Sequence, residues 1–169
     1  MEGDRTRIVV REGLIAGAIG ATSVALWFLI LDLIAGRPLF TPQVLGQALF
    51  SVLGPPPDDA AHLLDTTTVQ LIGYTIFHYA AFIAVGLLAA YVLELAHEEP
   101  SVLLGFIILF VAFEIGFHGL VALLQQTTVL GALAWYQVML GNLIAASFMG
   151  VYLWRAHPEI GEELAHALD

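Results

Sequence analysis

Apolar and polar positions follow one another in long blocks along the chain, and four of these blocks are almost entirely apolar. They cover residues 13–35, 69–95, 101–124 and 130–154. A helix needs about 20 predominantly apolar residues to cross the hydrocarbon core of a bilayer, and each block reaches that length. The pattern therefore predicts an all-α integral membrane protein, a four-helix bundle whose successive helices run up and down.

The connection between the first two blocks, residues 37–67, predicts a short helix of its own. Thr41 and Pro42 have the residue types of a helix N-cap and first helical position, and apolar residues continue to about Leu53. Gly54 and the three prolines that follow it end this helix. We expect it to lie on the membrane surface or over the mouth of the bundle. Further along, Thr67 and Gln70 have the spacing of a capping box at the start of the second block.

Composition agrees with a single transmembrane domain over residues 1–169. Hydrophobic residues make up 59% of the chain and charged residues 12%, whereas a typical soluble domain is about 25% charged. Lysine is absent and there are five arginines, which excludes the dense basic surface of a nucleic-acid-binding protein. Cysteine is absent as well, which excludes disulfides, thiolate metal sites and cysteine nucleophiles.

The arginines predict the orientation in the membrane. Four of the five lie on one side of the predicted spans: Arg5, Arg7, Arg11 and Arg155. Arg37 alone lies on the other side. The positive-inside rule then places both termini in the cytoplasm and residues 37–67 outside it. The acidic tail, residues 156–169, is cytoplasmic in this arrangement. We expect the protein in the cell membrane of a bacterium or archaeon, with the lipid bilayer as its first partner.

Small residues at intervals of four mark faces on which membrane helices approach closely. The first block carries the longest such row, namely Gly13, Gly17, Ala21 and Ala25. The second block offers Gly73, Ala80, Ala81 and Ala84, and the fourth offers Ala146 and Gly150 after Asn142. Asp32 follows seven residues after Ala25, so we expect this acid to face the interior of the bundle.

Four ionisable residues lie inside the predicted spans: Asp32, His78, Glu114 and His118. Ionisable groups are costly in a bilayer, so they usually face the bundle interior and mark a functional site. In a hairpin that turns near residue 98, His78 and His118 lie at equal depth. Glu114 is one helical turn from His118 on the same face. The sequence therefore predicts a polar cluster in the outer half of the bundle.

Two imidazoles and one carboxylate suit a transition metal, with Fe, Zn, Cu or Mn as candidates. His78, Glu114 and His118 are the predicted ligands. Alternatively, His78 and His118 are the axial ligands of a haem. The expected second shell comprises Asp32, Tyr74, Gln137 and Asn142. The cluster matches no named catalytic motif, since His-Glu-x-x-His is absent.

Three other interpretations stay open at this point. His78 and Glu114 could form a buried pair that only fixes the register of two helices. The same residues could relay protons or ions. The small size and the minimal soluble mass also suit a non-catalytic subunit or assembly factor of a larger membrane complex, or a homo-oligomer.

Overall fold

The computed structural model describes residues 2–54, 65–96 and 135–157, and these residues form four helices. Helix α1 spans Glu2–Ile34, α2 Phe40–Leu53, α4 Thr66–Ala96 and α7 Trp135–Ala156. The all-helical prediction is confirmed for this part of the chain, and α1, α4 and α7 are each long and apolar enough to cross a membrane. The predicted span over residues 101–124 lies outside the described residues.

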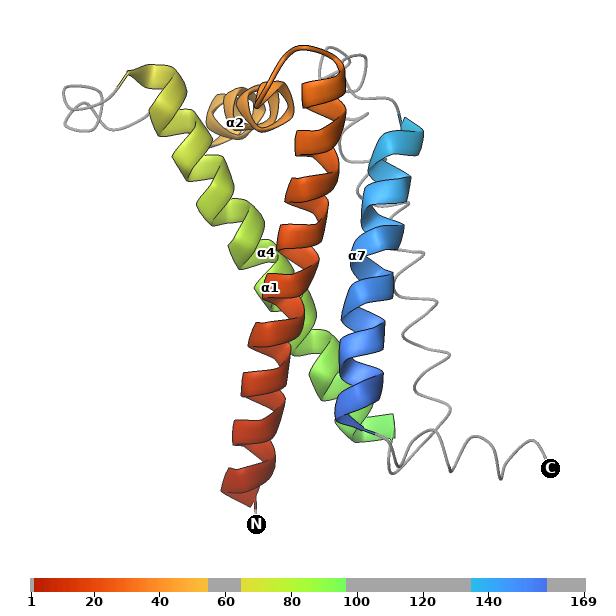
Figure 1. Ribbon diagram of the computed structural model, residues 1–169. Coiled ribbons are helices and arrows are strands. Elements are labelled where there is room, and N and C mark those ends of the chain that lie inside the picture. The colour runs from red at the N-terminus through yellow and green to blue at the C-terminus, as the bar shows by residue number, and fades with distance from the viewer. Residues whose placement is uncertain (1, 55–64, 97–134, 158–169) are drawn as a thin grey trace.

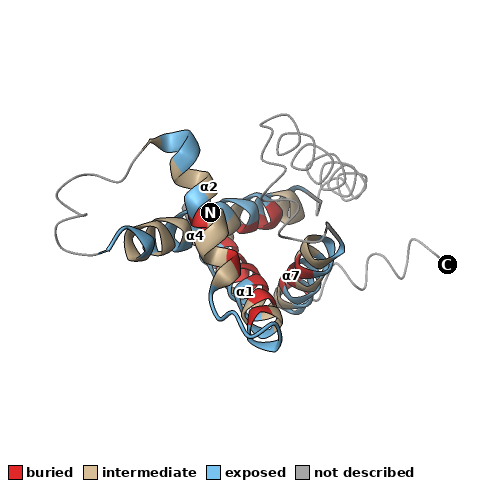
Figure 2. Ribbon diagram, turned by 90° about the horizontal axis from the view of Figure 1, so that it is seen from above, coloured by how far each residue is buried: buried red, intermediate tan, exposed pale blue. Residues whose placement is uncertain are grey.

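Helix α1 lies at the centre of the described helices (Figure 1). Helix α4 crosses it and α7 packs along it, and both run in the direction opposite to α1. We call the end that carries the N-terminus in Figure 1 the lower end, and the end that carries α2 the upper end. Seen from above, buried residues gather where α1 meets α4 and α7, and exposed residues cover the outward faces (Figure 2).

Glycine residues allow α1 and α4 to approach closely where the two helices cross. A Cβ atom added to Gly13 would lie 2.6 Å from the Cα of Leu87, and one added to Gly17 would lie 2.5 Å from the Cα of Ile83. On α4, a Cβ added to Gly86 would overlap the backbone of both α1 glycines. The two backbones are therefore in direct contact, as the row of small residues in α1 predicts.

Helix α7 packs on α1 along a different face from the predicted one. Gly141, Ala145, Met149 and Leu153 contact α1 or pack in the cores that α1 shares with its neighbours. Ala146 and Gly150 are exposed, and a side chain at Gly150 would meet nothing within 4 Å. The predicted face was displaced by one residue. The face that packs on α1 includes the large apolar side chains of Met149 and Leu153, whereas the prediction considered small residues alone. On α4, Ala80, Ala81 and Ala84 are likewise exposed.

Helix α2 lies across the upper end, between α1 and α4 (Figure 1). Its Gly46 packs against the backbone of Gln70, and the Phe50 ring covers Gly73 on α4. The helix ends at Leu53 as predicted, but it begins at Phe40, one residue before Thr41. Leu39 precedes it with a φ of 64° and has no polar side chain that could cap the helix. The cap comes from α1 instead, where Asp32 accepts the backbone N–H of Thr41.

Helix α4 begins after Asp65 and not at the predicted capping box. The carboxylate of Asp65 accepts hydrogen bonds from the backbone N–H and the hydroxyl of Thr68. An acid three residues before its backbone donor is the usual N-cap arrangement. These two bonds stabilise the charged carboxylate and lower the pKa of Asp65 below its ordinary value.

Candidate functional site

His78 is buried in the middle of α4, where that helix passes α1. Its Nε2 lies 3.0 Å from the backbone carbonyl oxygen of Ala21. A carbonyl oxygen only accepts, so Nε2 carries a hydrogen and donates it. Ala21 is itself fully buried, and its small side chain leaves room for the imidazole to reach the backbone of α1.

The other ring nitrogen of His78, Nδ1, is available to bind a further group. The structure records no second hydrogen bond to this ring from the described residues. When the neutral imidazole donates through Nε2, its Nδ1 carries a lone pair that can accept a hydrogen bond or bind a metal. The bond to Ala21 thus fixes both the tautomer and the position of the ring.

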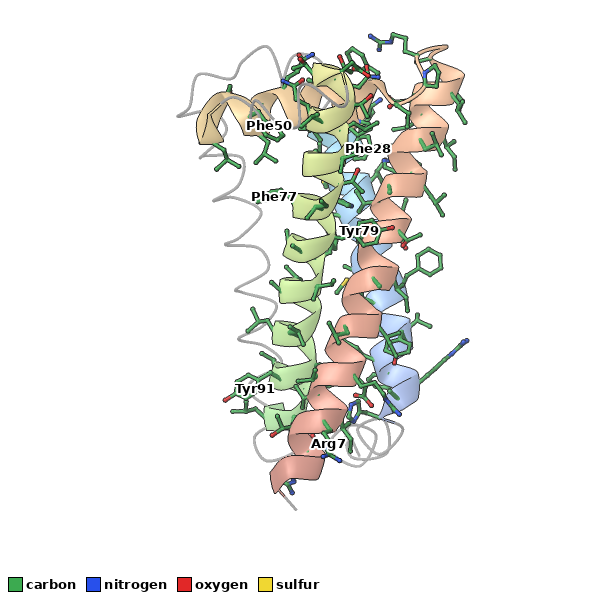
Figure 3. All side chains as sticks on the ribbon, turned by 90° about the vertical axis from the view of Figure 1, so that its left-hand side faces the viewer. Arg7, Phe28, Phe50, Phe77, Tyr79 and Tyr91 are labelled. Atoms are coloured by element: carbon green, nitrogen blue, oxygen red, sulfur yellow. The ribbon has the colours of Figure 1, made fainter. Side chains whose placement is uncertain are left out.

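Three aromatic side chains of α4 surround this imidazole. The ring centroids of Phe82, Tyr74 and Tyr79 lie 4.9, 5.7 and 5.9 Å from that of His78. The predicted neighbour Tyr74 is therefore beside His78, one turn closer to the upper end. The hydroxyl groups of Tyr79 (Figure 3) and Thr22 form a hydrogen bond of 3.0 Å. This bond is a second polar link between α1 and α4.

Asp32 does not lie beside His78. Its Oδ2 accepts the backbone N–H of Thr41 and its Oδ1 accepts the Thr41 hydroxyl, each at 2.8 Å. Both residues are buried, with 5% and 3% of their surface exposed. Asp32 is eleven residues beyond Ala21 in α1, which corresponds to about 16 Å along the helix axis. The carboxylate is occupied in joining α1 to the first turn of α2.

The predicted second-shell residues of α7 lie nearer to the upper end than His78 does. The backbone carbonyl of Gln137 accepts a hydrogen bond of 2.9 Å from Trp27 Nε1. Trp27 is six residues beyond Ala21 in α1, about 9 Å along the axis. Asn142 is half-buried on the next turn of α7. Within the described helices, the polar groups are thus spread along α1 and do not gather at the level of His78.

Sequence reasoning missed a second buried pair, at the lower end. His157, which the pattern assigned to the tail, directly follows α7, and its Nε2 lies 2.7 Å from the Glu12 carboxylate. Their side chains are 9% and 6% exposed. Glu12 stands four residues before the buried Ala16, and that spacing is the signal that could have placed it on the α7 side of α1.

The two remaining predicted ligands, Glu114 and His118, lie outside the described residues. Within residues 2–54, 65–96 and 135–157 there is no group of three histidine, aspartate or glutamate side chains that could hold a metal ion. A site centred on His78 would therefore need ligands from elsewhere in the chain. No protein-family model, no curated protein and no solved structure matches this sequence.

Proposed function

We propose that the chain is an integral membrane protein with four spans and with both termini in the cytoplasm. The outward faces of α1, α4 and α7 support insertion, because large apolar side chains are exposed there along the whole length of the helices. They include Leu26, Ile30, Ile76, Phe77, Leu143 and Phe148. Helix α4 ends at the lower end and α7 begins at the upper end (Figure 1), so a further crossing between them suits this order.

The proposed function is to bind a transition metal or haem iron inside the membrane, with His78, Glu114 and His118 as ligands. The observation that carries the proposal is the hydrogen bond from His78 Nε2 to the Ala21 carbonyl. Metal-binding histidines commonly donate their other ring N–H to a carbonyl or carboxylate, which orients the ring and strengthens the ligand. His78 has this arrangement, with Nδ1 as the nitrogen that would bind the metal.

The chain's own residues would have defined tasks at such a site. The Ala21 carbonyl holds the imidazole, and the rings of Tyr74 and Phe82 shield it from lipid and water. A bound iron, copper or manganese would supply one-electron chemistry, and zinc would supply a Lewis acid. Asp32 has no part in this version of the site, because it binds Thr41 and lies about 16 Å along α1 from Ala21.

The competing proposal is a bundle that serves as a non-catalytic subunit or assembly factor of a larger complex. One observation favours it. Among the described residues, every side-chain nitrogen and oxygen that is completely shielded from solvent has a hydrogen-bond partner, so these shielded polar groups are satisfied within the protein. His78 would then only join α4 to α1.

Metal analysis and a visible absorption spectrum of the purified full-length protein test the proposal. We expect about one metal or haem per chain in the natural protein and a loss of at least tenfold in occupancy in His78→Ala. The control is Tyr79→Phe, which removes a neighbouring polar group of α4 and should keep full occupancy. A colourless, metal-free protein that takes up no added Fe, Zn, Cu or Mn would overturn the metal proposal and favour the subunit.

A further inference from the structure

Most of the arginines lie at the lower end of the molecule, and the two acidic side chains described at this end each have a partner. The Glu12 carboxylate is buried against His157. The Glu94 carboxylate lies 3.6 Å from Arg5 Nε, on the surface between α1 and α4. Both carboxylates that the described side chains bring to this end therefore already have a cationic or hydrogen-bonding partner.

Three arginines at the same end have no such partner among the described residues. Arg7, Arg11 and Arg155 are exposed, and the described residues provide no ion pair to any of them. Arg7 and Arg11 are one turn apart in α1, and Arg155 is in the last turn of α7, two residues before His157. A guanidinium group without an internal carboxylate is free to bind an anion from outside.

Aromatic side chains lie at the same level as these arginines. Tyr91 of α4 is 57% exposed and Trp154 of α7 is 51% exposed. Tyr91 lies one turn below Leu87, which packs against Gly13, and Figure 3 shows it near the end that carries Arg7. Exposed tyrosine and tryptophan are typical of the zone where the hydrocarbon core of a membrane meets the lipid headgroups.

We propose that Arg7, Arg11 and Arg155 bind the phosphate groups of anionic phospholipids in the leaflet at the lower end. Guanidinium groups bind phosphate through paired hydrogen bonds, and arginines beside a membrane span are attracted to anionic lipid. The upper end differs, because its one arginine, Arg37, lies 4.0 Å above the Phe40 ring. This inference rests on the membrane insertion proposed above and is independent of any metal.

Native mass spectrometry tests this inference on the detergent-purified full chain, mixed with equal amounts of phosphatidylglycerol and phosphatidylcholine. We expect the natural protein to retain phosphatidylglycerol preferentially. Each arginine changed to glutamine should weaken phosphatidylglycerol binding roughly fivefold, and Arg7→Gln/Arg11→Gln/Arg155→Gln should abolish the preference. The matched control is Arg37→Gln, which removes the arginine of the opposite end and should keep the preference.

A second triple variant controls for the possibility that the glutamine triple variant loses the lipid preference because it misfolds. Arg7→Lys/Arg11→Lys/Arg155→Lys keeps the three charges and should keep most of the preference, with unchanged helical content by circular dichroism. A natural protein that binds both lipids equally, or a glutamine triple variant that keeps the full preference, would overturn the inference. Extraction of the chain from membranes by alkaline carbonate would contradict the membrane insertion itself, so the two failures are distinguishable.

Discussion

In its lower half α1 meets α4 backbone to backbone, whereas in its upper half α2 fills the space between the two helices (Figure 1). Gly13, Gly17 and Gly86 make the lower contact, in which backbone atoms of the two helices meet directly. The upper contact depends on the Phe50 ring and on the buried pair of Asp32 and Thr41. Close approach and polar capping are thus two separate ways of fixing α4 to α1.

The largest expected effect comes from a methyl group in the lower contact. In Gly17→Ala the new Cβ would lie 2.5 Å from the Cα of Ile83, so the backbones must separate. We expect a loss of about 3 kcal/mol in the free energy of unfolding, measured by denaturation in mixed detergent micelles. Gly150→Ala is the control, since nothing lies within 4 Å of its Cβ. Equal stabilities of the two variants would contradict a contact between backbones.

A smaller loss is expected from breaking the upper pair. Asp32→Ala leaves the buried N–H and hydroxyl of Thr41 without an acceptor, which should cost about 2 kcal/mol in the free energy of unfolding. Limited proteolysis should then cut within α2 before it cuts α1. Asp32→Asn retains one acceptor oxygen and should lie between the alanine variant and the natural protein. If cleavage of α2 stayed at the natural rate in Asp32→Ala, the pair would not hold this helix.

The smallest effect is expected at the exposed N-cap of α4. Hydrogen bonds from Thr68 lower the pKa of Asp65 from its ordinary value of 3.8. Its stabilising contribution is therefore fully present above about pH 4 and disappears as the pH falls through the lowered pKa of the folded state. Thermal unfolding of Asp65→Asn between pH 2 and pH 6 should show a weaker pH dependence than the natural protein. Identical profiles would mean that the cap adds nothing to stability.

Hydropathy predicted the apolar part of α1, α4 and α7 but not the full length of these helices. Helix α1 begins at Glu2, eleven residues before the apolar block, because polar residues continue the helix where the apolar pattern has already ended. The start of α2 was also displaced, since its cap comes from Asp32 in another helix and not from a neighbouring residue. Local patterns cannot predict a cap of that kind.

For the predicted site as well, the sequence predicted which residues are buried but not which of them lie close together. The burial of His78 and Asp32 follows from the cost of polar groups in an apolar helix, and the structure places both inside. The sequence did not predict that Asp32 lies about 16 Å along α1 from the level of His78, because depth was counted from the turn near residue 98, which gives no information on the level of a residue in α1. Glu12 and His157 were missed because both stand at the edges of their apolar blocks.

His78 lies where the two regions meet, and it is either a metal ligand or only a link between α4 and α1. Comparing His78→Gln with His78→Ala separates its two nitrogens, because a glutamine amide can still donate to the Ala21 carbonyl but supplies no imidazole ligand. The decisive measurement is metal content together with thermal stability. If His78 is a metal ligand, both variants lose the metal, but the metal-free His78→Gln protein keeps the thermal stability of the metal-free natural protein. A glutamine variant that matches the natural protein in metal content would show that His78 is not a metal ligand and only joins α4 to α1.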